Sequence, residues 1–368
     1  MRSLAGLRVG LVGPLPPPAG GMAMQTRQLA ELLRAEQAEV TLIATNPPYR
    51  PAWVGRVRGV RALFRLLPYL ATLWRSARRV DVVHVMANSG WSWHLFATPA
   101  LWIARLRGTP VVVNYRGGEA GAFLQRSAAL VRRSMRRAAQ LVVPSGFLCE
   151  VFGRHGMTAS VVPNIVDLQR FRPGPRLAAP QVIVARNLEP IYDNATAIRA
   201  FALAHAQWPA ARLLLAGSGP EETRLRALVA ELALGEAVEF AGRLDRDTMA
   251  ARLRESHVAL NPSRVDNMPN SVLEAMASGV PVVSTDAGGV PYIVTHERSA
   301  LLVPPGQPEA MAKALIRLLG DPALADRLRV HAMSDVQAYT WASVGPQWAK
   351  VYARAVEGSA PAPVEVLR

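Results

Sequence analysis

The chain has 368 residues, half of them apolar, so it is long enough for two domains of ordinary size and too hydrophobic for a disordered protein. Residues 1–165 hold 21 basic and 6 acidic residues, whereas residues 166–368 hold 21 of each, so the whole net charge of +15 lies in the first part. This uneven distribution predicts that an acidic surface meets the N-terminal half.

The N-terminal residues predict the start of a doubly wound α/β sheet. The apolar run over residues 7–13 lacks the length and cleavage site of a signal peptide and is typical of a buried parallel strand. A glycine loop and a helix from Gln25 to Ala35 follow it. Gly20 and Gly21 would let the backbone approach a phosphate or a sugar. The loop lacks the dinucleotide spacing, so a plain tight turn is an equal alternative.

Arginines and large apolar residues alternate over residues 50–79, which contain no acidic residue. The pattern predicts a basic amphipathic helix in a membrane interface, where anionic lipid attracts the arginines. The expected membrane contacts are Arg56, Arg58, Arg61, Arg65 and Trp74. One alternative is a helix that packs its apolar side on the sheet. A nucleic-acid surface is another, although no nucleic-acid-binding motif supports it. No run of about 20 residues is apolar enough to span a membrane.

The rest of the first half continues the alternation of strands and helices. Val40 to Thr45 predict a second strand, residues 81–87 a third, and residues 108–124 a fourth that ends in a polar glycine loop. Arg116 lies in that loop, at the carboxyl end of a strand, where open α/β sheets bind ligands. A second basic helix, with a solvated face as its plain alternative, is expected from Gln125 to Arg137.

The second half begins after a linker of proline and small residues at 172–180. Arg186 follows its first strand. A Gly-x-Gly-Pro turn that contains Gly217 follows the next strand, and Gly242 to Leu244 follow a further one. The histidines are scattered and show no spacing typical of metal ligands.

Residues 261–289, NPSRVDNMPNSVLEAMASGVPVVSTDAGG, organise the second half. They predict a buried strand end, a loop, a helix that opens near Asn270 or Ser271, and a second strand. Ser271 and Glu274 form a capping-box pattern, so the loop should lie at a helix N-terminus, which favours an anion. Asp266 at the helix mouth and Glu274 inside it could hold both ends of a phosphorylated, polyhydroxylated ligand. The plain alternative is a capped helix with a solvated Asp266.

This stretch resembles the signature of glycosyltransferase family 4, retaining enzymes with the GT-B fold. The signature is a carboxylate, seven residues, a glutamate and an Ala-Met-Ala-x-Gly-x-Pro-Val-Val run, here Asp266, Glu274 and AMASGVPVV. The family usually has Glu at the first position. The resemblance implies an α/β protein of two Rossmann-like domains that face each other across a cleft.

The resemblance also implies the domain limits. Residues 1–170 would bind the acceptor, with a terminal helix at about 341–357 packed back on them, and Pro163-Asn164 would mark the hinge. Residues 178–340 would bind the nucleotide-sugar donor. Separately, the Pro-, Ala- and Val-rich composition of residues 358–368 predicts a disordered tail.

The site residues implied by the family cover both halves of the chain. Those expected in catalysis are Asp266, Glu274, Arg186 and Arg116, the last at a position where the family commonly has His. Those expected to bind the donor are Gly20, Gly21, Arg186, Gly217, Gly242, Arg243, Leu244, Asn267, Met268, Pro269, Asn270, Ser271, Val272 and Glu274. Arg186 and the helix N-terminus would carry the diphosphate, Asp266 the sugar hydroxyls, and Glu274 the ribose hydroxyls.

One basic residue of the family pattern is missing. The family has a lysine a few residues after Arg186, but the only lysines here are Lys313 and Lys350. Tyr192, Asp193 or Asn194 takes its place, so the clamp on the diphosphate is weaker than usual.

The expected function is therefore transfer of a sugar from a UDP-, GDP- or similar nucleotide-sugar donor, without a metal or cofactor, to a lipid-linked or cell-surface glycan. No nucleic-acid partner is expected. The single cysteine fits a reducing compartment, so the enzyme would lie in the cytoplasm, on the inner face of the plasma membrane. The main alternative is a catalytically degenerate protein that binds nucleotide-sugar or docks a membrane complex without turnover. A nucleotide-sugar epimerase is a weaker one.

Overall fold

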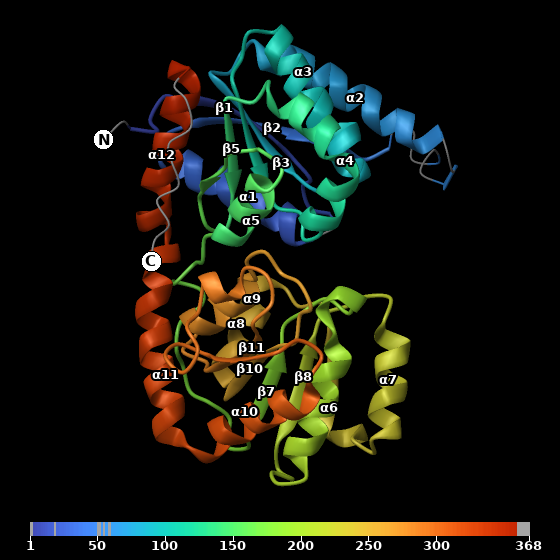
Figure 1. The fold of residues 1–368 in the computed structure, drawn as a ribbon, viewed down its shortest axis with the longest axis vertical. Coiled ribbons are helices and arrows are strands. Elements are labelled where there is room, and N and C mark those ends of the chain that lie inside the picture. The colour runs from blue at the N-terminus through green and yellow to red at the C-terminus, as the bar shows by residue number, and fades with distance from the viewer. Residues whose placement is uncertain (1–2, 18–19, 50–52, 54–55, 58–59, 359–368) are drawn as a thin grey trace. The chain divides into compact units, whose positions relative to one another are not determined.

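The computed structural model describes residues 3–17, 20–49, 53, 56–57 and 60–358 (Figure 1). The chain divides into two compact units. One comprises residues 1–163 together with residues 345–368, and the other comprises residues 164–344. Apart from Gly358, the tail predicted at 358–368 lies outside the described residues.

The first unit is built on a six-stranded parallel sheet in the order β2-β1-β3-β4-β5-β6. Its strands are β1 (Arg8–Gly13), β2 (Glu39–Ala44), β3 (Val82–Ala87), β4 (Val111–Tyr115), β5 (Gln140–Val143) and β6 (Ser160–Val161). Its helices are α1 (Gly21–Ala35), α2 (Val60–Ala77), the π-helical turn η2 (Trp93–Ala97), α3 (Thr98–Leu106), α4 (Ala120–Met135) and α5 (Gly146–Gly153). Every residue of β3 and β4 is buried, because helices cover both faces of a parallel sheet.

The second unit repeats this architecture in the order β12-β11-β10-β7-β8-β9, also with parallel strands. Its strands are β7 (Gln181–Val184), β8 (Arg212–Ala216), β9 (Val238–Gly242), β10 (Val258–Asn261), β11 (Val282–Thr285) and β12 (Leu301–Val303). Its helices are α6 (Asn194–His205), α7 (Glu222–Glu231), α8 (Arg246–Glu255), α9 (Asn270–Ala277), α10 (Pro308–Gly320) and α11 (Pro322–Asp335). Short 3₁₀ turns are η3 (Pro190–Tyr192), η4 (Gly235–Ala237), η5 (Val290–Tyr292) and η6 (Val336–Tyr339).

The strand order fixes where each sheet can bind a ligand. In the second sheet the order reverses between β7 and β10, which pair directly through Val258 and Val182. In the first sheet it reverses between β1 and β3. Open α/β sheets bind ligands outside the carboxyl ends of the strands at such a reversal. The loops after β7 and β10 are therefore the first place to look for a site in the second unit.

The last helix, α12 (Trp341–Glu357), contributes two buried aromatic residues to the first unit. The Trp348 ring lies 4.8 Å from the imidazole of His84 on β3, centroid to centroid. The Tyr352 hydroxyl lies 2.8 Å from Nδ1 of the same imidazole. On its other side, Nε2 of His84 lies 3.1 Å from Nδ2 of Asn114 on β4.

The protonation state of His84 follows from this chain of hydrogen bonds. Arg116 Nε donates to Asn114 Oδ1 at 2.8 Å, and a guanidinium cannot accept. The amide nitrogen of Asn114 therefore faces His84, so Nε2 accepts and Nδ1 donates to Tyr352. Burial lowers the pKa of His84 to about 3, with a smaller contribution from the charge of Arg116, so the ring stays neutral.

We expect Tyr352→Phe to lower the free energy of unfolding by about 1–3 kcal/mol, because it leaves a buried imidazole N–H without an acceptor. Urea denaturation at neutral pH measures the change. Tyr49→Phe is the matched control, since the Tyr49 hydroxyl makes no hydrogen bond within the described part of the chain. Equal stability of the two variants would contradict the assigned hydrogen bond.

Candidate active site

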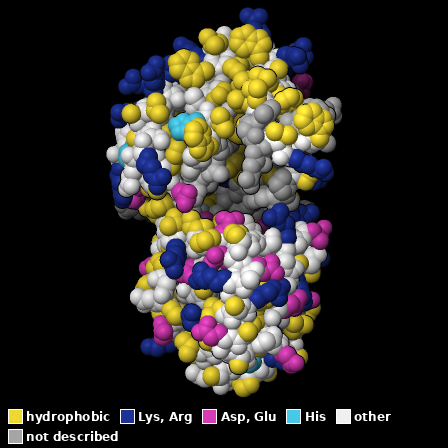
Figure 2. Space-filling view, turned by 90° about the vertical axis from the view of Figure 1, so that its right-hand side faces the viewer, with side chains coloured by type: hydrophobic (Ala, Val, Ile, Leu, Met, Phe, Trp, Pro, Cys, Tyr) yellow, Lys and Arg dark blue, Asp and Glu magenta, His cyan; other side chains and the backbone are white. Residues whose placement is uncertain are grey.

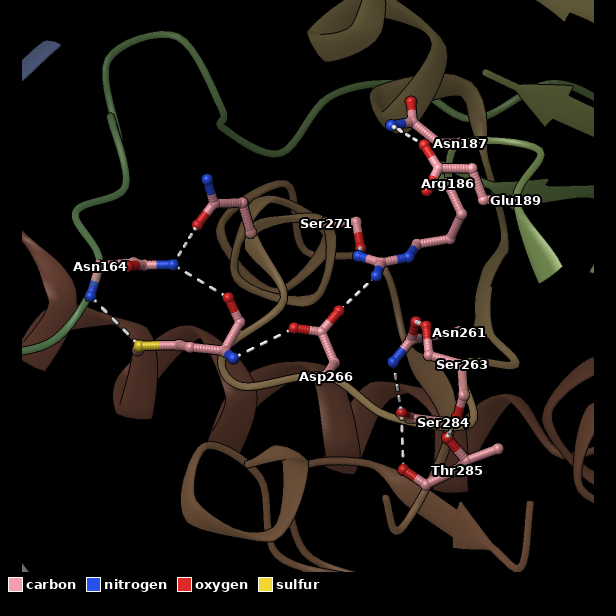
Figure 3. A network of polar contacts seen from close by, with 12 residues as sticks. Asn164, Arg186, Asn187, Glu189, Asn261, Ser263, Asp266, Ser271, Ser284 and Thr285 are labelled. Carbon is pink, nitrogen blue, oxygen red and sulfur yellow. Dashed lines mark hydrogen bonds and ion pairs between the residues drawn. The ribbon is translucent and has the colours of Figure 1, made fainter. Parts of the chain in front are cut away.

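Three side chains that sequence analysis selected meet at the reversal in the second sheet. Arg186 comes two residues after β7, Asp266 lies in the loop after β10, and Ser271 is in the first turn of α9. Arg186 Nη2 pairs with Asp266 Oδ2, and Nη1 donates to Ser271 Oγ at 3.3 Å (Figure 3). The structure thus brings Arg186, Asp266 and the helix start together.

The ion pair between Arg186 and Asp266 is largely shielded from solvent. The two side chains are 9% and 14% exposed, and the guanidinium carbon lies 4.0 Å from the centroid of the Tyr192 ring. Removing one partner of a buried pair strands the other charge, typically at about 3–5 kcal/mol. Arg186 Nε is buried and has no hydrogen-bond partner among the described residues, so this guanidinium keeps donor capacity for an anion.

Asp266 is fixed by its own loop. Its Oδ1 accepts from the Met268 N–H at 3.1 Å, and its carbonyl accepts from the Gly289 N–H at 2.7 Å. Gly288 has φ +60°, and a Cβ at this position would lie 2.2 Å from the Asp266 carbonyl oxygen. Gly288 is therefore required for the close contact that orients the acidic loop, and Gly289 contributes its backbone N–H.

A buried polar network anchors the base of the same loop. Asn261 Nδ2 donates to Ser284 Oγ at 2.9 Å, and Ser263 Oγ donates to Asn261 Oδ1 at 2.8 Å (Figure 3). Thr285 Oγ1 donates to the Ser263 carbonyl at 2.6 Å. These bonds join the end of β10 to the end of β11, so the loop starts from a rigid edge of the sheet.

Asn164, the first residue of the second unit, holds the other end of the loop. Its side-chain Nδ2 donates to the Met268 carbonyl at 2.9 Å and to Asn270 Oδ1 at 2.7 Å (Figure 3). Its backbone N–H points at Met268 Sδ, 3.1 Å away. Sequence analysis placed Asn164 at the hinge but missed this role, because the two segments lie 104 residues apart.

The predicted capping box at the start of α9 is wrong. The helix begins at Asn270 with Pro269 as its N-cap, and no side chain caps it. Ser271 therefore lies inside the first turn, where its hydroxyl accepts from Arg186 instead. The Val272 N–H donates to the Pro269 carbonyl at 3.2 Å and so is engaged within the helix.

Glu274 lies in the second turn of α9 and is half-buried. Burial raises the pKa of its carboxyl to about 7, against smaller opposing effects of the positive charges of Arg246 and Arg186. The carboxylate forms no hydrogen bond or ion pair with any residue that the structure describes. Sequence analysis did not single out Arg246, since it is one of many arginines and follows no recognisable motif.

Two glycines of the second unit that were predicted to bind the donor also have structural roles. A Cβ on Gly217 would lie 2.0 Å from the Arg186 carbonyl oxygen, so this glycine lets the loop after β7 pack on the loop after β8. Gly242 has φ +65° and ends β9. Beyond it, Arg243 is exposed and Leu244 is half-buried.

The three residues at the missing lysine's position make different contacts, and Tyr192 contacts Arg186. The Tyr192 ring stacks on the Arg186 guanidinium. Asp193 is buried with φ 43° and pairs with Arg264, whose Nε lies 3.0 Å from its Oδ2. Asn194 Nδ2 donates to the Asn187 carbonyl at 2.9 Å. None of the three supplies a positive charge.

The remaining predicted residues belong to the first unit, and their roles stay predictions. Gly20 is the N-cap of α1, and Gly21 is its first residue. Arg116 is half-buried beyond β4, and burial lowers the pKa of its guanidinium to about 10.

The residues predicted to contact a membrane are only partly described. Arg56 is exposed, Trp74 is 45% exposed, and Arg65 lies over the Tyr49 ring at 4.5 Å. Arg58 and the side chain of Arg61 lie outside the described residues. No helix in the described residues is both long and apolar enough to cross a bilayer. The same residues contain no group of three His, Cys, Asp or Glu side chains suited to a metal ion.

Comparison with solved structures defines the class of the fold. Sucrose-phosphate synthase from Thermosynechococcus elongatus matches with a TM-score of 0.78 and 22% identity, over 96% of this chain and all of that one. Anabaena HepE, solved with UDP and glucose, matches with a TM-score of 0.74 and 18% identity, over 94% and 99% of the two chains. The predicted fold class, GT-B, is confirmed.

Sequence comparison then gives the family. The model described as "Glycosyltransferase Family 4" matches residues 19–170, and "Glycosyl transferases group 1" matches residues 179–321. The chain belongs to this glycosyltransferase family, group 1 or family 4. It is similar to D-inositol 3-phosphate glycosyltransferase of Jonesia denitrificans, 29% identical over 63% of this chain and 58% of that protein. The chain spans between 22% and 58% of the length of three curated relatives that it matches.

The raised pKa of Glu274 predicts a pH-dependent effect of Glu274→Gln on stability. The unfolded carboxyl ionises near pH 4.5 and the folded one near pH 7, so the wild type should lose stability as pH rises through this interval. As the pH increases from 4.5 to 8, the free energy of unfolding of Glu274→Gln should rise by about 1–3 kcal/mol relative to that of the wild type. Urea denaturation at several pH values measures this difference. The control is Glu231→Gln, which replaces an exposed carboxylate on α7. Parallel pH profiles of wild type and Glu274→Gln would contradict the assignment.

Proposed function

We propose that the protein is a retaining glycosyltransferase that moves a sugar from a nucleotide-diphosphate donor to a lipid-linked or cell-surface glycan. The observation that carries this proposal is the shielded pair of Arg186 and Asp266 at the start of α9, with the half-buried Glu274 inside the helix. The UDP and glucose in the HepE structure, and the glycosyl transfer named for the Jonesia relative, support a nucleotide-sugar donor.

The leaving diphosphate requires positive charge and hydrogen-bond donors that are in place before the reaction. Arg186 would bind it with the donors that Asp266 does not use, together with the backbone at the N-terminus of α9. The charge of Arg246 also reaches this region, since it acts on the carboxyl of Glu274. These groups would compensate for the missing lysine and stabilise the leaving group without a metal.

The two carboxylates would bind different parts of the donor. Asp266 lies at the helix mouth and would accept hydrogen bonds from sugar hydroxyls near the anomeric carbon. Glu274 lacks a hydrogen-bond partner in the described residues and would accept from the ribose hydroxyls, the usual complement of a carboxylate to a diol. Positioning and charge stabilisation would then provide most of the catalysis, and the departing phosphate would serve as the base.

Single substitutions test these roles. Arg186→Ala should weaken the affinity for UDP or GDP by about 10- to 100-fold, because it removes charge-assisted hydrogen bonds. Asp266→Ala and Glu274→Ala should abolish release of nucleotide from a nucleotide-sugar while the circular dichroism spectrum stays unchanged. Calorimetry and a nucleotide-release assay measure the two effects.

Arg212→Ala is the matched control for that experiment, because Arg212 is an exposed arginine at the start of β8. Unchanged turnover in both carboxylate variants would refute the proposed site. Donor binding with neither hydrolysis of the donor nor transfer to any glycan would instead favour the degenerate nucleotide-sugar-binding protein.

We also propose that α2 binds the inner face of the plasma membrane. The helix does pack on the sheet, since Tyr69, Leu73 and Ala77 are buried. Its other side nevertheless leaves large apolar side chains in solvent: Leu63 at 52% exposure, Phe64 at 40%, Leu67 at 56% and Trp74 at 45%. Figure 2 shows apolar and basic side chains gathered on the first unit. Exposed apolar groups beside arginines are typical of an interfacial helix.

Vesicle binding tests this surface. We expect the chain to sediment with phosphatidylglycerol vesicles more than with phosphatidylcholine vesicles, and less so at high salt. A Leu63→Gln/Phe64→Gln/Leu67→Gln variant should lose at least about tenfold in apparent affinity. Leu203→Gln, at a 46% exposed leucine of α6 in the second unit, is the control. Equal binding of the triple variant and the wild type would exclude α2 as the contact.

A further inference from the structure

A groove in the first unit involves none of the residues assigned so far. It opens beyond the carboxyl ends of β3 and β4, and its volume of about 430 Å³ lies within the range of small-molecule sites. Its lining includes Ser89, Trp91, His94, Glu119, Phe123 and Arg126. Residues 89–94 follow β3, and the others lie at the start of α4 or on one face of it. The groove therefore lies between two segments held by neighbouring strands.

One wall of the groove is aromatic. The Trp91 ring meets the His94 ring with centroids 6.3 Å apart at an interplanar angle of 73°, and His94 meets Phe123 at 5.9 Å and 65°. Exposure falls along this series from 78% at Trp91 to 8% at Phe123. The indole thus remains in solvent although two further rings support it. A tryptophan so exposed offers a flat apolar surface to a ligand.

The lining also holds polar and charged side chains. Glu119 and Arg126 are both exposed and lie seven positions apart, about two turns of α4, so they share one face of the helix. Neither side chain forms a hydrogen bond or an ion pair with another described residue. Towards the inner end, Ser89 Oγ is hydrogen-bonded to the Tyr115 hydroxyl at 2.7 Å. The groove therefore combines an apolar wall with one unused acceptor group and one unused donor group.

This combination matches the surface of a pyranose ring. Such a ring has an apolar face of C–H groups, which can stack on an indole, and an edge of hydroxyls that both donate and accept. Glu119 would accept from these hydroxyls, and Arg126 would donate to them. An acyl chain would leave both charged groups without partners. A free phosphate would meet the negative charge of Glu119.

We propose that the groove binds a pyranose ring of the glycan that receives the sugar, with Trp91 as the stacking platform. The proposal rests on the proposed glycosyl transfer, because it makes the groove the place where the second substrate is recognised. It specifies which part of the glycan acceptor is recognised, a pyranose ring, and which residue it stacks on, Trp91.

Saturation-transfer NMR on the full chain tests the groove directly. The probes are the methyl pyranosides of glucose, galactose, mannose and N-acetylglucosamine. At least one should show saturation with the wild type, and Trp91→Ala should weaken that binding about five- to tenfold. Glu119→Gln, which keeps the shape of the side chain, should weaken it as well. Trp102→Ala is the matched control, since Trp102 is 37% exposed on α3 and stacks with Arg137 outside the groove.

The outcomes separate this proposal from the donor site. UDP and GDP affinities, measured by calorimetry on the same samples, should be equal in the wild type, Trp91→Ala and Glu119→Gln. The proposed pyranose site is overturned if none of the four sugars binds, or if Trp91→Ala and Glu119→Gln both bind the sugar as tightly as the wild type does. A chain that binds a sugar through Trp91 but binds neither nucleotide supports the groove and refutes the donor assignment. Loss of phosphatidylglycerol vesicle binding in Trp91→Ala, with sugar binding intact, reassigns the groove to lipid and overturns the proposal.

Discussion

The proposed donor site depends on one buried interaction, the pairing of Arg186 with Asp266. Each residue would be costly to bury alone, and each follows a different strand at the reversal of the second sheet. Their attraction joins the loops after β7 and β10 and points both side chains at the first turn of α9. A diphosphate group would enter a site that already contains a guanidinium, a helix N-terminus and a carboxylate, so little reorganisation would accompany binding.

Several neighbouring residues have side chains, or lack them, in ways that allow Arg186 and Asp266 to pair. Tyr192 covers the guanidinium, Gly217 lets the Arg186 backbone lie close to the next loop, and Gly288 does the same for Asp266. Asn164 adds a further constraint, because the first residue of the second unit holds the acidic loop with its own side chain. A movement of the chain at Pro163-Asn164 would therefore act on Met268 and Asn270.

The sequence was sufficient to predict much of this arrangement. The alternation of buried runs and helices predicted a doubly wound α/β sheet, the family resemblance predicted two such domains, and the Asp266 to Glu274 spacing identified the central loop. Local sequence patterns did not predict the hydrogen-bond partners of residues whose contacts lie far away in the sequence. The Ser271 hydroxyl follows the capping pattern but accepts from Arg186, which is 85 positions away. The chain from Tyr352 through His84 and Asn114 to Arg116 joins residues up to 268 positions apart, and no local motif records it.

The most direct test of the account is a crystal structure of the chain with UDP or GDP bound. We expect the diphosphate to lie within hydrogen-bond distance of the Arg186 guanidinium and the first turn of α9, and the ribose hydroxyls to contact the Glu274 carboxylate. A nucleotide that contacts neither Arg186 nor Glu274 would contradict it.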